Sequence, residues 1–245
     1  MTQVERIVIL TGAGISAESG IDTFRSAGGL WEQHRVEDVA TPEGFARDPE
    51  LVLRFYDMRR AALTSVEANA AHRALARLER EFVKTPGREL LLVTQNVDDL
   101  HERGGSEQVL HMHGELKSAL CTSCGTRSRW EEPMLLEGGA GGTGRPPCPV
   151  CQAPTLRPDV VWFGEMPYQM ERIYSALATC DLFVSIGTSG AVYPAAGFVQ
   201  EARAAGAATL ELNLEPSEGT HFFAEARHGP AGVLVPAWVD EVLGV

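Results

Sequence analysis

The sequence predicts an α/β protein in which helices cover both faces of a parallel sheet and a small cysteine-bearing module is inserted into the chain. Three observations support this. Short apolar runs alternate with helical patterns, the first run leads directly into a glycine-rich turn, and two Cys-x-x-Cys pairs interrupt the alternation. The apolar runs, which we expect to form buried strands, occupy residues 6–10, 89–95, 181–187 and 209–215.

Helical patterns lie between these runs. In residues 69–82, four apolar side chains from Ala71 to Phe82 recur at the spacing of one helix face. Residues 194–206 begin with proline and end with glycine, which favour the first turn and the end of a helix. A third pattern, residues 51–66, follows an Asp-Pro start signal. This alternation predicts parallel strands joined by helical crossovers.

The first predicted strand runs into a Gly-x-Gly-x-x-Ala turn at Gly12, Gly14 and Ala17. Such a turn lets backbone amides approach a pyrophosphate, although a lone glycine pattern is equally compatible with a plain tight turn. Hydride-transfer enzymes also place an acidic residue at the end of a second strand, about 20 residues further on. Here residues 24–35 contain Glu32 but no strand. A dinucleotide is therefore compatible with the turn, while the usual dehydrogenase layout is not present.

Polar residues follow the other predicted strands. Open α/β sheets place their ligands at the carboxyl ends of the strands, so these side chains are expected to meet around one ligand. They are Gln95, Asn96 and Asp98 after the second strand, the hydroxyls of residues 187–194 after the third, and Asn213 and Glu215 after the fourth.

Four of the five cysteines form Cys121-x-x-Cys124 and Cys148-x-x-Cys151. This zinc-ribbon spacing predicts a closed tetrahedral structural site with four thiolate ligands, and disulfide or redox use is the weaker alternative. Since four sulfurs complete the shell, neighbouring histidines are not needed as ligands. Cys180, just before an apolar run, is expected to be a small core residue.

Composition excludes some classes of function. The chain has 245 residues, 44% hydrophobic content and a formal net charge of −12, which argues against a nucleic-acid partner. The N-terminus carries no export signal, so we expect a cytoplasmic protein. Residues 182–200 form the longest uncharged segment, but glycines and a proline break it, so a strand-to-helix turn is favoured over a membrane span. Nothing indicates an oligomer, and a monomer is expected.

The chain closely resembles the sirtuins, NAD-dependent protein lysine deacylases. The matching pieces appear in the family's order and span nearly the whole chain. They are "GAGISAESGIDTFR", "TQNVDDLHERGG", "HMHGEL", the paired Cys-x-x-Cys, "PDVVWFGE", "GTSGAVYP" and "NLEP".

The resemblance implies a Rossmann-type doubly wound domain of residues 1–36, 67–117 and 158–245 that binds NAD. It also implies a small domain made of a helical insert, residues 37–66, and a zinc module, residues 118–157, with the substrate between the two domains. The positions implied for NAD are Gly12, Ala13, Gly14, Ser16, Glu18, Thr23, Phe24 and Arg25 along the loop and ribose, Gln95, Asn96, Val97 and Asp98 at the nicotinamide, and Gly187, Thr188, Ser189, Asn213, Leu214, Glu215 and Ala231 at the phosphates and adenosine.

The resemblance makes His113 the general base, with Asn96 and Asp98 as further catalytic residues. In the family the acyl oxygen attacks the ribose as nicotinamide leaves, and a base then activates a ribose hydroxyl. An imidazole suits this role because its pKa lies near neutrality. His111 carries no such motif and is expected to be a buried or supporting histidine without a catalytic role.

Acyl selectivity is indicated by Tyr56 and Arg59, which share one helix face and offer a phenol and a guanidinium to a carboxylate. Alone, they would more often be a packed Tyr beside a solvated Arg. They resemble the Tyr-x-x-Arg of the subclass that removes succinyl and malonyl groups, and Ala40 matches the small residue that widens its acyl pocket. We therefore expect a dual deacetylase and desuccinylase that releases O-acyl-ADP-ribose.

The acylated peptide is expected to add a strand between residues 162–165 and 191–194, so that main-chain pairing gives little sequence preference. The residues implied in substrate binding, besides the acyl-pocket residues, are Val161, Phe163, Gly164, Glu165, Val192 and Tyr193.

One departure and three alternatives accompany this prediction. Asp22 stands where the family's commonest loop has Pro, so the loop loses a fixed φ.

An ADP-ribosyltransferase could use the same NAD pocket. A zinc-ribbon binding module needs a basic surface, but Glu131 and Glu132 lie beside Arg127 and Arg129. A zinc hydrolase is disfavoured because a closed four-sulfur shell leaves no position for water.

Overall fold

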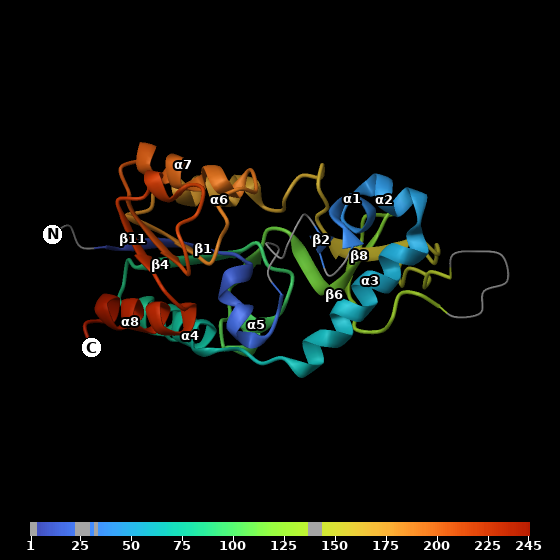
Figure 1. The fold of residues 1–245 in the computed structure, drawn as a ribbon, viewed down its shortest axis with the longest axis horizontal. Coiled ribbons are helices and arrows are strands. Elements are labelled where there is room, and N and C mark those ends of the chain that lie inside the picture. The colour runs from blue at the N-terminus through green and yellow to red at the C-terminus, as the bar shows by residue number, and fades with distance from the viewer. Residues whose placement is uncertain (1–3, 23–29, 32–33, 137–143) are drawn as a thin grey trace.

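A computed structural model describes residues 4–22, 30–31, 34–136 and 144–245 of the chain. A large α/β lobe contains both ends of the described chain, and a smaller lobe lies beside it (Figure 1).

The large lobe is built on a six-stranded parallel sheet in the order β11-β10-β9-β1-β4-β5. From β1 the chain moves outward through β4 to β5, then returns to the other side of β1 and continues through β9 to β11. The order therefore reverses between β1 and β9, which is where open α/β sheets bind ligands. The strands are β1 Arg6–Thr11, β4 Glu89–Thr94, β5 Val109–His111, β9 Leu182–Ile186, β10 Ala208–Asn213 and β11 Glu225–His228.

Helices cover both faces of this sheet, as the sequence predicted. Helices α4 (Ala70–Phe82) and α8 (Ala231–Leu243) lie on one face, and α6 (Met170–Leu177) and α7 (Phe198–Ala204) lie on the other (Figure 1). In β1, Ile7 and Ile9 belong to one apolar cluster, whereas Val8 and Leu10 belong to the other. Because alternate side chains enter two different cores, the strand reads as one continuous apolar run.

The smaller lobe combines short helices with a three-stranded antiparallel sheet in the order β7-β6-β8. The long helix α3 begins after Asp48, whose side chain accepts a hydrogen bond from the Leu51 N–H at 3.0 Å. On its far turn, buried Arg60 donates to the Leu116 carbonyl at 2.8 Å, which ties the helix to β6. The elements are α1 Val36–Val39, α2 Pro42–Arg47, α3 Pro49–Ala62, β6 Gly114–Cys121, β7 Arg127–Arg129 and β8 Leu156–Val160. The two-residue strands β2 Leu30–Trp31 and β3 His34–Arg35 pair with each other, so the expectation of no strand in residues 24–35 was wrong, although neither strand joins the parallel sheet.

The four strands predicted from the sequence are all present in the structure. The four predicted strands match observed strands to within two residues at each end, and residues 182–200 form β9, a loop and the start of α7. Within the described ranges, no helix has both the length and the apolar character needed to cross a membrane. The remaining elements are α5 Leu100–Arg103 and the 3₁₀ turns η1 Ala13–Ile15, η2 Ala17–Ser19, η3 Leu63–Ser65, η4 Ala195–Gly197 and η5 Thr220–Phe222.

Candidate active site

The glycine-rich turn after β1 packs directly on the turn after β9. The Gly14 N–H donates to the Gly187 carbonyl at 2.8 Å, and a Cβ built on Gly14 would lie 2.7 Å from the Gly187 Cα. Gly12 is equally close, with a built Cβ 2.9 Å from the Gly187 carbonyl oxygen. Two loops therefore meet at the topological reversal, and only residues without side chains allow this approach.

The loop after β4 brings Asn96 and Asp98 against the loop after β1. The Asn96 amide donates to the Ser16 hydroxyl at 3.1 Å, and that hydroxyl donates to Asp98 Oδ2, also at 3.1 Å. All three side chains are buried. Burial raises the pKa of Asp98, while hydrogen bonds from the Leu100 N–H and the Ser16 hydroxyl act in the opposite direction.

A second layer of buried polar side chains lies beneath this trio. His72 Nε2 lies 3.4 Å from the Ser16 hydroxyl, and His72 Nδ1 accepts the Asn69 N–H at 3.3 Å. Because Nδ1 accepts, Nε2 carries the proton and donates to Ser16. Thr11 joins the end of β1 to β4 through the Thr94 hydroxyl at 2.9 Å. Its hydroxyl also contacts His101 Nε2 at 2.9 Å.

Sequence reasoning missed this second layer. His72 lies on the inward face of a predicted helix. A single histidine among apolar residues by itself gives no indication in the sequence that it supports a site. The sequence offered one signal, a histidine three residues after Asn69, a residue type that often caps helices, whereas the burial of His72 is visible only in the structure.

His113 follows β5 and points its ring toward the loop after β4. Nδ1 lies 3.1 Å from the Gln95 carbonyl, which can only accept, so Nδ1 carries the proton of the neutral ring. Among the described residues, none bonds to Nε2, which keeps its lone pair. Burial lowers the pKa of His113, and the bond to Gln95 only partly opposes this. The ring is therefore neutral near pH 7 and holds an unshared base nitrogen.

His111, two residues earlier, contacts different partners. Nδ1 lies 3.2 Å from the Asn96 carbonyl, and Nε2 lies 2.8 Å from a carboxylate oxygen of Glu102. Neither His111 nor His113 lies in the cysteine cluster.

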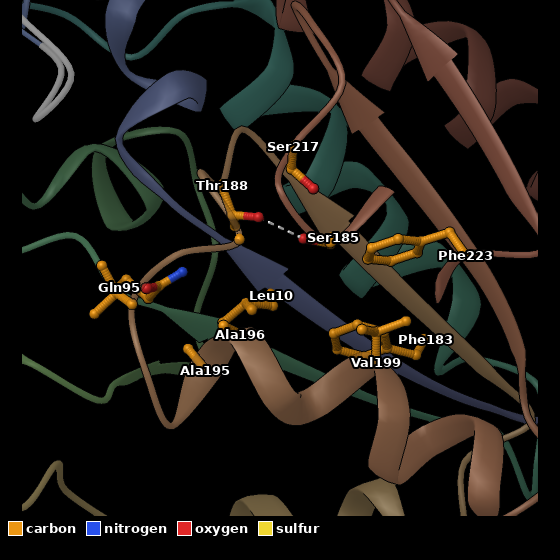
Figure 2. A pocket seen from close by; sticks show the side chains of 13 residues that line it. Leu10, Gln95, Phe183, Ser185, Thr188, Ala195, Ala196, Val199, Ser217 and Phe223 are labelled. Carbon is orange, nitrogen blue, oxygen red and sulfur yellow. Dashed lines mark hydrogen bonds between the residues drawn. The ribbon is translucent and has the colours of Figure 1, made fainter. Parts of the chain in front are cut away.

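The loops after β9 and β10 form the other end of the site. The Thr188 hydroxyl is 2.8 Å from Ser185 Oγ, and the Asn213 amide donates to the Thr188 carbonyl at 2.7 Å. Figure 2 shows these hydroxyls above a small pocket, with Gln95 toward one end and Phe223 toward the other.

The remaining predicted NAD positions fall around these loops. Glu18 accepts the Gly232 N–H at 2.8 Å, which ties the glycine-rich loop to the start of α8 beside Ala231. Leu214 and Glu215 are exposed just beyond β10. Thr23, Phe24 and Arg25 lie outside the described residues.

The predicted acyl-pocket residues come together in the smaller lobe. Tyr56 and Arg59 lie on α3 and are buried, and Ala40 and Trp162 belong to the same apolar cluster as Tyr56. The Trp162 indole N–H donates to the Tyr56 phenol oxygen at 3.0 Å. Burial raises the pKa of Tyr56 well above its ordinary value, so the phenol is neutral.

The segments expected to flank a peptide are partly exposed to solvent. Phe163 is 45% exposed and Tyr193 is 72% exposed. The Phe163 N–H donates to the Ala40 carbonyl at 3.0 Å, which connects one flank to the helical insert.

Glu165 forms two hydrogen bonds with buried Arg157, at 2.8 and 3.0 Å, so its carboxylate supports the turn at residues 162–165. The Val161 N–H donates to the His113 carbonyl at 2.8 Å. Val192 and Gly164 lie on the same two segments.

The four predicted zinc ligands gather at one point. Their sulfurs all lie within 4.8 Å of one another, with Cys121 and Cys151 separated by 3.6 Å and Cys124 and Cys148 by 3.8 Å. Tetrahedral zinc with Zn–S bonds of about 2.3 Å places its sulfurs about 3.8 Å apart. The spacing and the thiolate donor set therefore fit one structural zinc ion, as predicted. Cys180 is buried apart from them in the core.

Comparisons with known proteins agree with this arrangement. Residues 12–194 match the model of the Sir2 family. The chain is 54% identical over 246 aligned residues to a Salmonella typhimurium protein named NAD-dependent protein deacylase, an alignment that covers 99% of this chain and 86% of that protein. A solved Sir2 homolog in complex with NAD has a TM-score of 0.84 and 38% identity, covering 98% of this chain and 90% of that one. A Sir2 structure bound to acetylated peptide has a TM-score of 0.79 and 26% identity, covering 98% and 94%.

Proposed function

The chain belongs to the Sir2, or sirtuin, family and is an NAD-dependent protein deacylase, and on this basis we propose which of its residues perform the reaction. NAD lies along the carboxyl ends of β1, β4, β9 and β10. Its nicotinamide end lies at Asn96 and Asp98, and its phosphates and adenosine lie at Gly12–Gly14, Thr188, Ser189 and Asn213. Loops that meet at the reversal of strand order support this placement.

His113 is the general base in this proposal. Its Nδ1–H is held by the Gln95 carbonyl, so Nε2 can take a proton from a ribose hydroxyl without a change of tautomer. This tautomer is the single observation that carries the assignment. NAD supplies the electrophilic sugar carbon, and the chain supplies the base together with the amide and carboxylate of the nicotinamide pocket.

The test is nicotinamide release that requires both NAD and an acylated peptide. His113→Ala is expected to lower kcat by about 10²- to 10⁴-fold. His221→Ala, at an exposed histidine outside the site, is the matched control. Mass spectrometry of the products separates O-acyl-ADP-ribose, which supports deacylation, from ADP-ribosylated protein, which would show the alternative transfer reaction. Unchanged turnover in His113→Ala would contradict the base assignment.

We further propose that the acyl pocket accepts acidic acyl groups as well as acetyl. Arg59 is 8% exposed and its guanidinium carbon lies 5.7 Å from the Phe55 ring centroid. The guanidinium fork matches the geometry of a carboxylate, whereas an acetyl group carries no charge for it to pair with. Succinyl and malonyl groups are the matching chemistry.

Kinetics on matched acetyl and succinyl peptides test this selectivity. Arg59→Met is expected to lower kcat/KM for the succinyl peptide by about 100-fold and to change the acetyl value far less. Arg54→Met is the matched control, because Arg54 lies on the same helix but is exposed and paired with Glu50. Equal losses of kcat/KM on both peptides in Arg59→Met would show that Arg59 does not distinguish a succinyl from an acetyl group.

The peptide is proposed to bind as an added strand between residues 162–165 and 191–194. Exposed Phe163 and Tyr193, one on each flank, support this location.

The division into a Rossmann-type domain and a two-part small domain also stays a prediction. In the structure, β6 and β8 run through residues 117–118 and 157–158, where we expected boundaries, so these strands connect the proposed domains.

A further inference from the structure

His111 is held between two groups that can only accept hydrogen bonds. Its Nδ1 faces the Asn96 carbonyl at 3.2 Å, and its Nε2 faces the Glu102 carboxylate at 2.8 Å. A neutral imidazole has one N–H and one lone pair, so it satisfies only one of these acceptors. The imidazolium has two N–H groups and satisfies both. The geometry is therefore built for the protonated form of His111.

The Asn96 carbonyl belongs to a row of three that fix the loop after β4. The Gln95 carbonyl faces the His113 ring at 3.1 Å, and the Val97 carbonyl accepts the Leu116 N–H at 2.8 Å. Between them, Asn96 is held through its carbonyl by His111. This loop carries the side chains of Asn96 and Asp98, which we assigned to the nicotinamide end of the site.

We propose that His111 and Glu102 form a charged clamp that positions the Asn96–Asp98 loop for NAD, and that loss of the His111 proton loosens this clamp and weakens NAD binding. His111 is thus a positioning residue that acts through Asn96 and does not touch the reacting atoms. The inference rests on the proposed nicotinamide pocket, and it adds a pH-dependent support to that pocket.

The charged and titratable groups around His111 favour its cation. Glu102 comes from α5, Glu115 from β6 and Asp98 from the loop itself, whereas His101 on α5 is a neighbour that could add positive charge. Burial strongly lowers the pKa of His101, so that ring stays neutral. For His111, burial alone would lower the pKa, but the hydrogen bond to Glu102 and the charges of Glu102 and Glu115 outweigh it and raise the pKa above 6.5.

The direction of the pH effect follows from this shift. Because the pKa of His111 is raised above 6.5, the clamp is complete in acidic solution and is lost as pH rises through that raised pKa. His113 shifts the other way, and its base nitrogen is already free below pH 6.5. The two histidines are therefore expected to cause two separate changes in the pH profiles. Protonation of His113 lowers kcat at acidic pH, which we call the acid limb. Deprotonation of His111 raises the KM for NAD at alkaline pH, which we call the alkaline limb.

The experiment measures kcat and the KM for NAD from pH 5.5 to 9.5 with an acetylated peptide. In the wild-type protein, the KM for NAD is expected to rise about five- to tenfold across the alkaline limb. His111→Leu should show the high KM at every pH, with no alkaline limb and an unchanged acid limb in kcat. Glu102→Gln, which keeps an acceptor but removes the charge, should move the alkaline limb to lower pH, because the charge that raises the pKa of His111 is gone.

Controls separate this clamp from a general structural effect. His221→Leu removes an exposed histidine and should leave both limbs in place. An alkaline limb that persists unchanged in His111→Leu, or an equal loss of activity at every pH in Glu102→Gln, would overturn the clamp. If His111→Leu does not fold, Glu102→Gln alone tests the proposal: an alkaline limb at lower pH supports the clamp, and an unmoved limb contradicts it. Failure of the proposed function would look different, because the wild-type protein would then release no nicotinamide at any pH.

Discussion

The Trp162 indole N–H donates to the Tyr56 phenol oxygen at 3.0 Å, although 106 residues separate the two in the chain. Trp162 thereby occupies an acceptor position of the phenol, and its ring also stacks beneath the Arg157 guanidinium, whose central carbon lies 4.0 Å from the ring centroid. Since the phenol is neutral, its own proton stays available to donate toward an acyl carboxylate.

Replacing Trp162 should therefore change acyl selectivity. Trp162→Phe is expected to lower kcat/KM about fivefold more for a succinyl peptide than for an acetyl peptide, because one hydrogen bond that orients the phenol is lost. A double-mutant cycle with Tyr56→Phe gives the control: the succinyl-specific losses should not add, since both variants remove the same oriented hydroxyl. Fully additive losses would show that the two residues act separately.

The close approach of Gly14 to Gly187 predicts a strong effect of one methyl group. Gly14→Ala places a Cβ 2.7 Å from the Gly187 Cα, so one of the two loops must shift. We expect kcat/KM for NAD to fall by about 100-fold. Gly197→Ala is the control, because its nearest neighbour, a Tyr193 ring carbon, is 3.8 Å away. A crystal structure of Gly14→Ala with both loops unmoved would contradict this reasoning.

Zinc removal should affect stability more than chemistry. The cysteine cluster lies in the smaller lobe, apart from His113, and its four sulfurs leave no position for a reacting group. Metal analysis is expected to give one zinc ion per chain, and Cys124→Ser should lower both the zinc content and the Tm. Cys180→Ala, at the cysteine outside the cluster, should keep the zinc. Full zinc content in Cys124→Ser would exclude this cysteine as a ligand.

Buried His72 predicts weaker stability in acid. Burial lowers its pKa to about 4 from an ordinary value of 6.5. Between these values the unfolded chain binds more protons than the folded one, so the free energy of unfolding rises with pH, by up to about 3 kcal/mol for this group. Urea unfolding from pH 4.5 to 7 measures the slope.

His72→Gln should reduce that slope while lowering stability at pH 7, because it removes the titrating ring and disturbs the bond to Ser16. His221→Gln, at an exposed histidine, should leave the slope unchanged. An identical slope in His72→Gln and the wild-type protein would show that His72 does not contribute to it.

Much of the fold could be predicted from local pattern. The four apolar runs became β1, β4, β9 and β10 because each strand is buried on both faces. β11 was missed because its four residues, Glu225–His228, lie at a sheet edge and include only one apolar side chain. β5 is only three residues long, which is too short for a pattern. Helix α8 contains Pro236, which hides its helical character.

Motifs in the chain were enough to predict the four-cysteine cluster that fits zinc, the glycine turn that follows β1, and membership of a family whose pieces occur in a fixed order. They sufficed because local geometry or metal chemistry requires the residue types in these motifs. The family motif singled out His113 by resemblance, but the sequence could not give the tautomer or the charge of either His111 or His113. The three-dimensional fold was needed to show that one ring meets a single carbonyl and the other a carbonyl and a carboxylate. The partners of a histidine come from distant parts of the chain, and those partners fix its tautomer and its charge.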